Sequence, residues 1–264
     1  MFAHRRGDLP SAPLPLQPPN APPTGAPEGT PPENDPYAKA RHEMIEDQIR
    51  RRGVVMHSVL EALQEIPRHQ FVTPDYADRA YDDEALPSLE GQTISQPFMV
   101  AIMTQELALR PGLKVLEIGT GTGYQTAVLA HLVGPEGEVF TIERLEALTT
   151  FAKNRLEALG LGNVRYRVGD GSAGWPAGSG PVPRFERILI TAGAPAVPPP
   201  LLEQLADGGI LVAPIGASDS QTLVRVVRTG GSVRQTELLA CRFVPLVGEH
   251  AWSWDDCGRE HPRR

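Results

Sequence analysis

The stretch LKVLEIGTGTGYQTAVLAHLV, residues 113–133, decides the fold class of this sequence. It begins with a short apolar run, Leu113 to Ile118, that is typical of a buried strand, and it ends with the apolar spacing of a helix, Tyr124 to Val133. The intervening GTGTG, residues 119–123, lets the backbone turn sharply just ahead of a helix N-terminus. A strand, a glycine loop and a helix in this order indicate an α/β unit whose loop can approach a ligand closely.

Strand and helix patterns continue to alternate after this unit. Strands are predicted at residues 139–142, 164–168, 187–191 and 209–214, and a helix is predicted at 145–159. Because each right-handed crossover lays its helix back on the sheet, this succession predicts a mostly parallel, doubly wound sheet of the α/β class. Two β-rich runs, 222–228 and 232–239, are joined by Thr229-Gly230-Gly231, which predicts antiparallel strands at one edge.

The residues before this sheet follow a different pattern. Two helices are predicted between residues 37 and 66, the first ended by Gly53 and the second ended before Pro67, and residues 71–97 lack periodicity. Eleven of the 27 prolines lie between Pro10 and Pro36, in a stretch too poor in aromatic and β-branched residues to form a core. The expected organisation is a disordered proline-rich tail (1–36), a folded domain (37–250) made of a helical cap with a substrate loop (37–110) and a cofactor-binding sheet (111–250), and a C-terminal extension (251–264).

The composition excludes several classes of protein. Lys and Arg number 25 and Asp and Glu 32, so the net charge is −7 and no strong positive field attracts nucleic acid or an anionic membrane. Cys241 and Cys257 form no CxxC pair and the histidines show no ligand spacing, so we expect neither disulfides nor a metal site. No apolar run is long enough to span a bilayer, and no export signal is recognisable. These features favour a cytoplasmic protein.

Four loops are predicted to converge at the carboxyl ends of the parallel strands, where open α/β sheets bind ligands. In the first, the glycine loop, Tyr124 stands where the dinucleotide fingerprint GxGxxG requires glycine, which disfavours NAD. Glu143 ends the second strand, where a carboxylate can accept hydrogen bonds from both ribose hydroxyls or simply open the next helix. Asp170, after the third strand, could pair with the exocyclic amine of an adenine or form an ordinary turn. The small residues at 191–195 leave room for a substrate.

Two segments of the sequence resemble a known family. GQTISQPFMV, residues 91–100, is followed at one helix length by VLEIGTGTGY, residues 115–124, and the pair resembles the protein-L-isoaspartate (D-aspartate) O-methyltransferases. Many methyltransferases share the glycine loop, whereas TISQP is close to diagnostic of this family. Further similarity lies at residues 47–49, 66–72, 168–171, 174–176, 200–205 and 242–246, so that the resemblance extends from about residue 41 to 250.

The resemblance implies a protein repair enzyme with the Rossmann-like fold of the S-adenosylmethionine-dependent methyltransferases. It would transfer a methyl group from S-adenosyl-L-methionine to the free carboxylate of L-isoaspartyl residues in damaged proteins and peptides, leaving S-adenosyl-L-homocysteine, and the family name adds D-aspartyl residues. Ser95 is implied to be the active-site residue, and we expect the enzyme to be a monomer. The residues implied to bind substrate are Thr93, Ile94, Gln96 and Val247, and those implied to bind the cofactor are Gly119, Thr120, Gly121, Gly123, Glu143, Asp170 and Gly171.

Other functions are also consistent with the sequence. A methyltransferase acting on another substrate would share the glycine loop, although no Asn-Pro-Pro-Tyr or Asp-Pro-Pro-Tyr motif of base N-methylation follows the fourth strand. A noncatalytic module could bind the cofactor with the same fold. Residues 86–90, LPSLE, depart from the family pattern, which has a glycine there, so that the substrate loop is expected to differ in shape. Residues 247–252 are a candidate lid, against the alternative of a frayed terminus.

Overall fold

The computed structural model describes residues 35–255. Residues 1–34 and 256–264 lie outside the described part, and with them most of the expected proline-rich tail and most of the expected C-terminal extension. Within the described residues, no helix has the length and apolar character needed to cross a membrane. The same residues contain no group of three or more His, Cys, Asp or Glu side chains that could hold a metal ion.

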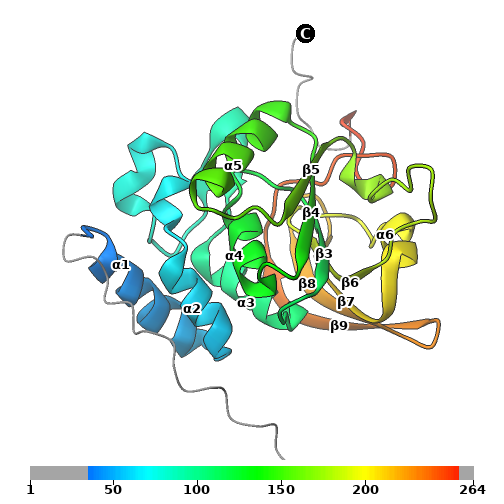
Figure 1. The fold of residues 1–264 in the computed structure, drawn as a ribbon, viewed down its shortest axis with the longest axis horizontal. Coiled ribbons are helices and arrows are strands. Elements are labelled where there is room, and N and C mark those ends of the chain that lie inside the picture. The colour runs from blue at the N-terminus through cyan, green and yellow to red at the C-terminus, as the bar shows by residue number, and fades with distance from the viewer. Residues whose placement is uncertain (1–34, 256–264) are drawn as a thin grey trace, which may run out of the picture. The chain divides into compact units, whose positions relative to one another are not determined.

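A seven-stranded sheet runs through the described part of the chain (Figure 1). Its order is β5-β4-β3-β6-β7-β8-β9, with parallel pairing from β5 to β7 and antiparallel pairing from β7 to β9. The chain builds outward from β3 in both directions, which confirms the doubly wound α/β class with antiparallel strands at one edge. The strands are β3 (Lys114–Ile118), β4 (Glu138–Glu143), β5 (Val164–Val168), β6 (Phe185–Ile190), β7 (Leu205–Gly216), β8 (Gln221–Thr229) and β9 (Ser232–Cys241).

Helices lie on both faces of this sheet, three of them on one face. These three are α3 (Pro97–Leu107), α4 (Tyr124–Val133) and α5 (Glu146–Ala158), and α6 (Pro199–Gln204) lies on the opposite face (Figure 1). Successive strand side chains point to opposite faces. Val115 therefore packs in the core that contains α3 and α4, whereas Leu116 packs with Leu201 of α6. Burial on both faces explains why β3 and β6 are mostly apolar, whereas the edge strand β5 carries Arg165 and Arg167 and has no fully buried residue.

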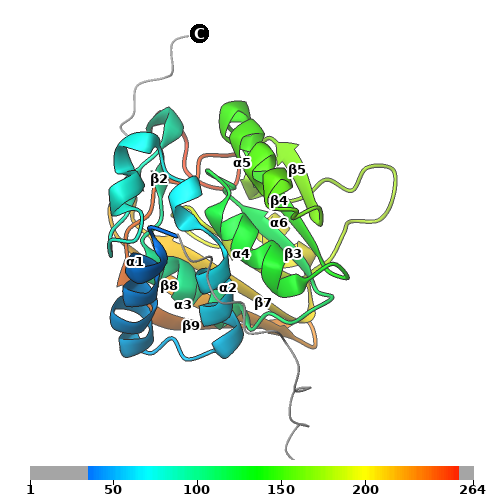
Figure 2. The same cartoon turned by 60° about the vertical axis from the view of Figure 1, so that its left-hand side comes forward.

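The N-terminal helices cover the face that carries α3 and α4. The segments are α1 (Ala38–Glu43), a π-helical turn (Met44–Ile49), a 3-10 turn (Arg50–Arg52) and α2 (His57–Glu65). The first three follow one another directly and end at Gly53, whose φ of +96° is the usual left-handed helix end. α2 packs against α3 and α4 (Figure 2). Both predicted helices are confirmed, but the π-helical turn was not predicted; it brings Met44 and Ile49, five residues apart, to the buried side.

The segment between α2 and α3 is irregular, as predicted. It contains short 3-10 helices at Arg68–Gln70, Pro74–Arg79 and Leu89–Gly91. It also contains a small antiparallel hairpin of β1 (Leu86–Pro87) and β2 (Thr93–Ile94), in which the buried Leu86 pairs with the buried Ile94. The sequence did not predict this hairpin because two residues are too few to show a period. α6 was also missed, since it is six residues long and starts with two prolines.

The antiparallel edge matches its prediction closely. β8 and β9 are joined by Gly230 and Gly231, with φ of +55° and +83°, and Thr229 pairs with Ser232. Positive φ at both loop residues is what a type I′ hairpin requires. The Gly-Gly pair therefore sets the register from Thr229–Ser232 to Val224–Glu237, and beyond Val224 an irregularity shifts it by one residue.

Candidate active site

A pocket lies at the carboxyl ends of β3, β4, β5 and β6, where the strand order switches direction. The loops after all four strands contribute to it, as the sequence led us to expect. The segment around β2 and the chain after β9 complete its wall. The predicted site residues that line this pocket are Thr93, Ile94, Ser95, Gly119, Thr120, Gly121, Gly123, Glu143, Gly171 and Val247.

The glycine loop can take its path only without side chains at two of its positions. Gly119 has φ of +97°, and a Cβ there would overlap Thr191 Oγ1. Gly123 has φ of +94°, and a Cβ there would lie 2.9 Å from the Cβ of Ala152. Thr191 Oγ1 also donates hydrogen bonds to the carbonyls of Gly119 (2.6 Å) and Ile118 (2.9 Å). The loop is therefore held between the end of β6 and helix α5.

Glu143, the last residue of β4, lies against this loop. Its side chain lines the pocket and is 9% exposed. Oε2 accepts a hydrogen bond from the amide of Gly121 at 3.1 Å, and Oε1 accepts one from the amide of Leu145 at 3.1 Å. Each carboxylate oxygen can accept a further bond. Glu143 thus fixes the backbone at Leu145, directly before helix α5, and each of its oxygens can still accept a hydrogen bond from a hydroxyl of a ligand in the pocket.

Glu117, on β3 just before the glycine loop, was not assigned a role from the sequence. It is fully buried; Oε2 accepts hydrogen bonds from the hydroxyls of Thr126 (2.6 Å) and Thr141 (2.7 Å), and Oε1 has no partner among the described residues. Burial raises the pKa of Glu117 to about 8, so the carboxyl is mostly protonated at neutral pH. Thr141 also bonds Thr120 of the loop at 2.6 Å. An acidic residue between the apolar Leu116 and Ile118 was the sequence signal for this network.

Asp170 lies outside the pocket lining. Its Oδ1 accepts hydrogen bonds from the amide (2.8 Å) and hydroxyl (2.7 Å) of Ser172, and its Oδ2 accepts one from the amide of Glu249 (2.7 Å). The structure thus shows the turn that was the alternative for this residue, and an adenine contact stays a prediction. The neighbouring Gly171 does line the pocket, and a Cβ there would overlap Ile118 Cγ2.

Ser95 lies where the pocket meets a second cavity, which we call the outer groove. The outer groove lies between residues 83–99 and residues 239–244, the end of β9 and the chain after it. Thr93, Ser95, Thr191 and Val244 line both cavities. Gln96 lines only the outer groove, and its Nε2 donates to the carbonyl of Asp83 at 2.9 Å. Ser95 is therefore in position to contact a group that enters from the outer groove and reaches the pocket.

The chain after β9 is bonded to the rest of the domain. Val244 and Leu246 exchange backbone hydrogen bonds with Gly193, each 2.8 Å long. The amide of Gly248 donates to the carbonyl of Trp252 at 3.1 Å. These bonds argue against a frayed terminus at residues 247–252, while closure of this segment as a lid stays a prediction.

Comparisons with known proteins agree on one family. The protein-L-isoaspartate (D-aspartate) O-methyltransferase family matches residues 39–251. A protein-L-isoaspartate O-methyltransferase of Syntrophus aciditrophicus (strain SB) is 49% identical over 222 residues, covering 83% of this chain and 99% of that protein. The one from Magnetococcus marinus is 52% identical over 202 residues, covering 76% of this chain and 86% of that protein.

Solved structures agree with this. A protein-L-isoaspartate O-methyltransferase structure aligns with a TM-score of 0.72 at 31% identity, covering 80% of this chain and 67% of that one. A structure from Plasmodium falciparum, in complex with S-adenosyl-L-homocysteine, aligns with a TM-score of 0.70 at 22% identity, covering 81% of this chain and 99% of that one. At 22% identity, the similarity to the Plasmodium falciparum structure shows only that the two chains share a fold.

Proposed function

Because the chain belongs to the protein-L-isoaspartate (D-aspartate) O-methyltransferase family, we propose that it methylates the free carboxylate of isoaspartyl residues in an active site that contains Ser95. It is a carboxyl methyltransferase that uses S-adenosyl-L-methionine and releases S-adenosyl-L-homocysteine, and its substrates are damaged proteins. The methyl ester then collapses to a succinimide, whose hydrolysis restores some normal aspartate. D-aspartyl residues are a further proposed substrate.

The observation that carries this proposal is the position of Ser95 and Thr93. Both residues line the pocket at the strand ends and the outer groove. A cofactor in the pocket and a peptide in the outer groove would therefore meet at these two residues. A noncatalytic cofactor-binding module would not need such a junction.

The residues of the pocket fit the proposed cofactor. Gly119 and Gly171 let the two loops that line the pocket pack against Thr191 and Ile118, where any side chain would collide, so the shape of the pocket depends on both glycines. Glu143 offers two carboxylate oxygens to the ribose hydroxyls. The proposed cofactor-binding residues are Gly119, Thr120, Gly121, Gly123, Glu143, Asp170 and Gly171, of which Asp170 would act through its backbone or through the chain it holds.

The chemistry asks little of the protein beyond position. When bound, the cofactor supplies a methyl group on a sulfonium, which is already electrophilic. The substrate carboxylate is ionised at neutral pH, so it needs no general base. No described side chain hydrogen-bonds the Ser95 hydroxyl, which argues against a covalent nucleophile activated by a base. Ser95 would instead orient the carboxylate in line with the methyl group, and the pocket wall would keep water away.

The remaining substrate contacts follow from the same junction. Thr93 and Ile94 precede Ser95 on β2, Gln96 faces the outer groove, and Val247 lies on the pocket wall contributed by the chain after β9. We assign these four residues to substrate binding. We also propose that the enzyme is monomeric and cytoplasmic and that it binds neither nucleic acid nor membrane. The net charge of −7 supports the absence of nucleic-acid and membrane binding.

The decisive assay mixes the purified protein with radiolabelled S-adenosyl-L-methionine and two peptides that differ only in an aspartyl or an isoaspartyl linkage. Base-labile label confined to the isoaspartyl peptide is the expected result. Label in neither peptide would favour a noncatalytic module, and label in both would favour another substrate class. A variant that lacks residues 1–36 should keep the parental kcat/KM if the catalytic unit begins at residue 37.

A further inference from the structure

Arg68 is a fully buried arginine next to the substrate segment. It begins the 3-10 helix Arg68–Gln70, and its side chain is 0% exposed. Nε donates to the carbonyl of Ala80 at 2.6 Å, and Nη2 donates to the carbonyl of Ser95 at 2.8 Å. One guanidinium therefore joins the backbone of the active-site serine to the segment before β1.

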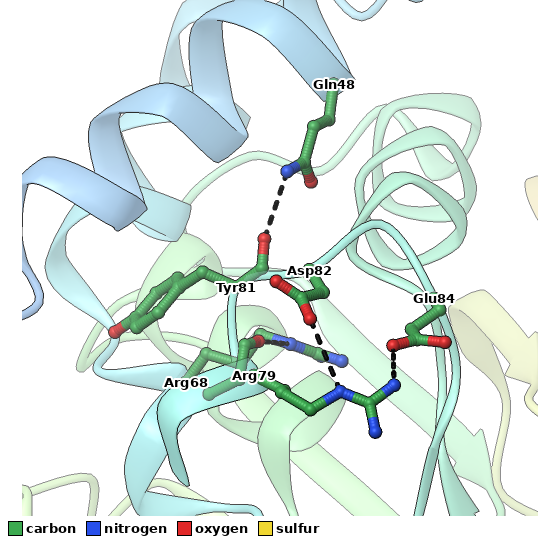
Figure 3. A network of polar contacts seen from close by, with 7 residues as sticks. Gln48, Arg68, Arg79, Tyr81, Asp82 and Glu84 are labelled. Carbon is green, nitrogen blue, oxygen red and sulfur yellow. Dashed lines mark hydrogen bonds and ion pairs between the residues drawn. The ribbon is translucent and has the colours of Figure 1, made fainter. Parts of the chain in front are cut away.

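The ion pairs of that segment do not include Arg68. Arg79 pairs with Asp82 and Glu84 at the surface, and Gln48 donates to the carbonyl of Tyr81 at 3.1 Å (Figure 3). Figure 3 shows Arg68 beside this network. These contacts lie on either side of Ala80, whose carbonyl accepts the Arg68 hydrogen bond.

The positive charge of Arg68 is not balanced locally. No carboxylate of the described residues forms an ion pair with it, and Nη1 has no hydrogen-bond partner among them. Its guanidinium lies over the ring of Tyr124, 4.9 Å from the ring centre, and Tyr124 lines the cofactor pocket. Burial lowers the pKa of Arg68 to about 10, which still leaves it charged at neutral pH.

Packing alone does not account for a cation at this place. Removing a charge from water costs several kcal/mol, and two carbonyl dipoles and one ring face recover only part of that cost. An apolar side chain of similar volume would fill the same space without it. An anionic group that arrives only with the substrate would supply the missing balance.

We propose that Arg68 is a positioning residue for methyl transfer: it fixes Ser95 through the Ser95 carbonyl and attracts the isoaspartyl carboxylate to the junction. This inference rests on the proposed function. Arg68 would act on the carboxylate only through Ser95 and without a direct hydrogen bond. This arrangement suits the reaction, because the carboxylate loses its charge as it attacks the sulfonium. A guanidinium bonded directly to the carboxylate would stabilise the reactant more than the transition state and slow the attack.

Two variants of Arg68 separate its charge from its fork of donors. Arg68→Met keeps the length and the apolar volume of the side chain but removes both the positive charge and the hydrogen-bond donors. Arg68→Lys keeps the charge but replaces the planar fork, which can hold two carbonyls at fixed angles, with a single ammonium.

Arg187 provides the matched control. It is also a buried arginine that donates to backbone carbonyls, those of Leu107 and Ala108. These carbonyls lie at the far end of α3, the helix whose first residue, Pro97, follows the Ser95-Gln96 pair. Arg187→Met therefore removes an equivalent anchor without touching the substrate segment.

The measurements are kcat and KM for an isoaspartyl peptide, the affinity for S-adenosyl-L-homocysteine by calorimetry, and the melting temperature. For Arg68→Met we expect kcat/KM to fall about 10- to 100-fold, the range for losing hydrogen bonds to a charged donor, with cofactor affinity within about twofold of the parent. Arg68→Lys should recover KM but not kcat. Arg187→Met should lower the melting temperature and leave kcat/KM unchanged.

Parental kcat/KM in folded Arg68→Met would overturn the proposal, as would an equal loss of kcat/KM in Arg187→Met. If Arg68→Met does not fold, Arg68→Lys decides: a lower kcat with parental KM and cofactor affinity supports the proposal, and any other result overturns it. A parent protein that labels no isoaspartyl peptide would instead refute the proposed function, so the two failures are distinguishable.

Discussion

Glu143 Oε2 accepts a hydrogen bond from the amide of Gly121 over 3.1 Å, so one carboxylate joins the end of β4 to the glycine loop that follows β3. The same side chain holds the amide of Leu145 at the start of α5. A ligand that bonds Glu143 therefore meets an acceptor whose orientation is already fixed from two sides.

Glu143→Ala should weaken the binding of S-adenosyl-L-homocysteine by ~1–3 kcal/mol, the scale of losing hydrogen bonds to a charged group. Titration calorimetry measures the change directly. Glu146→Ala, at an exposed position at the start of the same helix, serves as the control and should bind like the parent. Parental affinity in Glu143→Ala would remove Glu143 from the cofactor site.

Ser95→Ala should abolish most turnover while cofactor affinity is retained, because we propose that Ser95 orients the substrate carboxylate where the pocket meets the outer groove. The assay is methyl transfer to an isoaspartyl peptide, with calorimetry on the same preparation. Ser58→Ala changes an exposed serine of α2 and should keep parental turnover. Full activity in Ser95→Ala would mean that the hydroxyl plays no part in the mechanism.

The sequence predicted the sheet well because its signals are local. β5 and α4 match their predicted bounds residue for residue: β5 alternates Val164, Tyr166 and Val168 with arginines, and the helical period of α4 ends at a glycine. The meeting of the glycine loop, Glu143 and Gly171 followed from topology, since parallel strands end at a common edge.

What the sequence could not predict depends on distant partners. Asp170 was left open between an adenine contact and a turn, and its bond to the amide of Glu249 joins residues 79 positions apart. The fork of Arg68 reaches Ser95, 27 positions away, across an irregular segment that shows no period. Such contacts are products of the folded chain, and no local pattern announces them.

Glu117 should make stability depend on pH. Its pKa rises from 4.5 to about 8 on burial, so the folded state holds a proton that the unfolded state has released between these values. The contribution of Glu117 to the free energy of unfolding is thus fully present below pH 4.5 and is lost as the pH rises through about 8. Glu117→Gln, which is neutral at every pH, should gain melting temperature relative to the parent at pH 8.5 and show a smaller difference at pH 5. A difference that does not change with pH would contradict the assignment.

Asp170→Ala tests whether this side chain serves the turn or the cofactor. The carboxylate caps Ser172 and bonds the amide of Glu249, while the Ser172 hydroxyl accepts from the amide of His250 at 3.0 Å. Losing the cap should cost about 1–2 kcal/mol of stability, and the chain after β9 should become easier to cleave by protease. Cofactor should restore protection if Val247 closes on it, which limited proteolysis with and without S-adenosyl-L-homocysteine measures. Asp170→Asn keeps one acceptor oxygen, which can serve Ser172 or the amide of Glu249 but not both, so it should lose less stability than Asp170→Ala. A variant with parental stability and protection but weakened cofactor binding would return Asp170 to the adenine role instead.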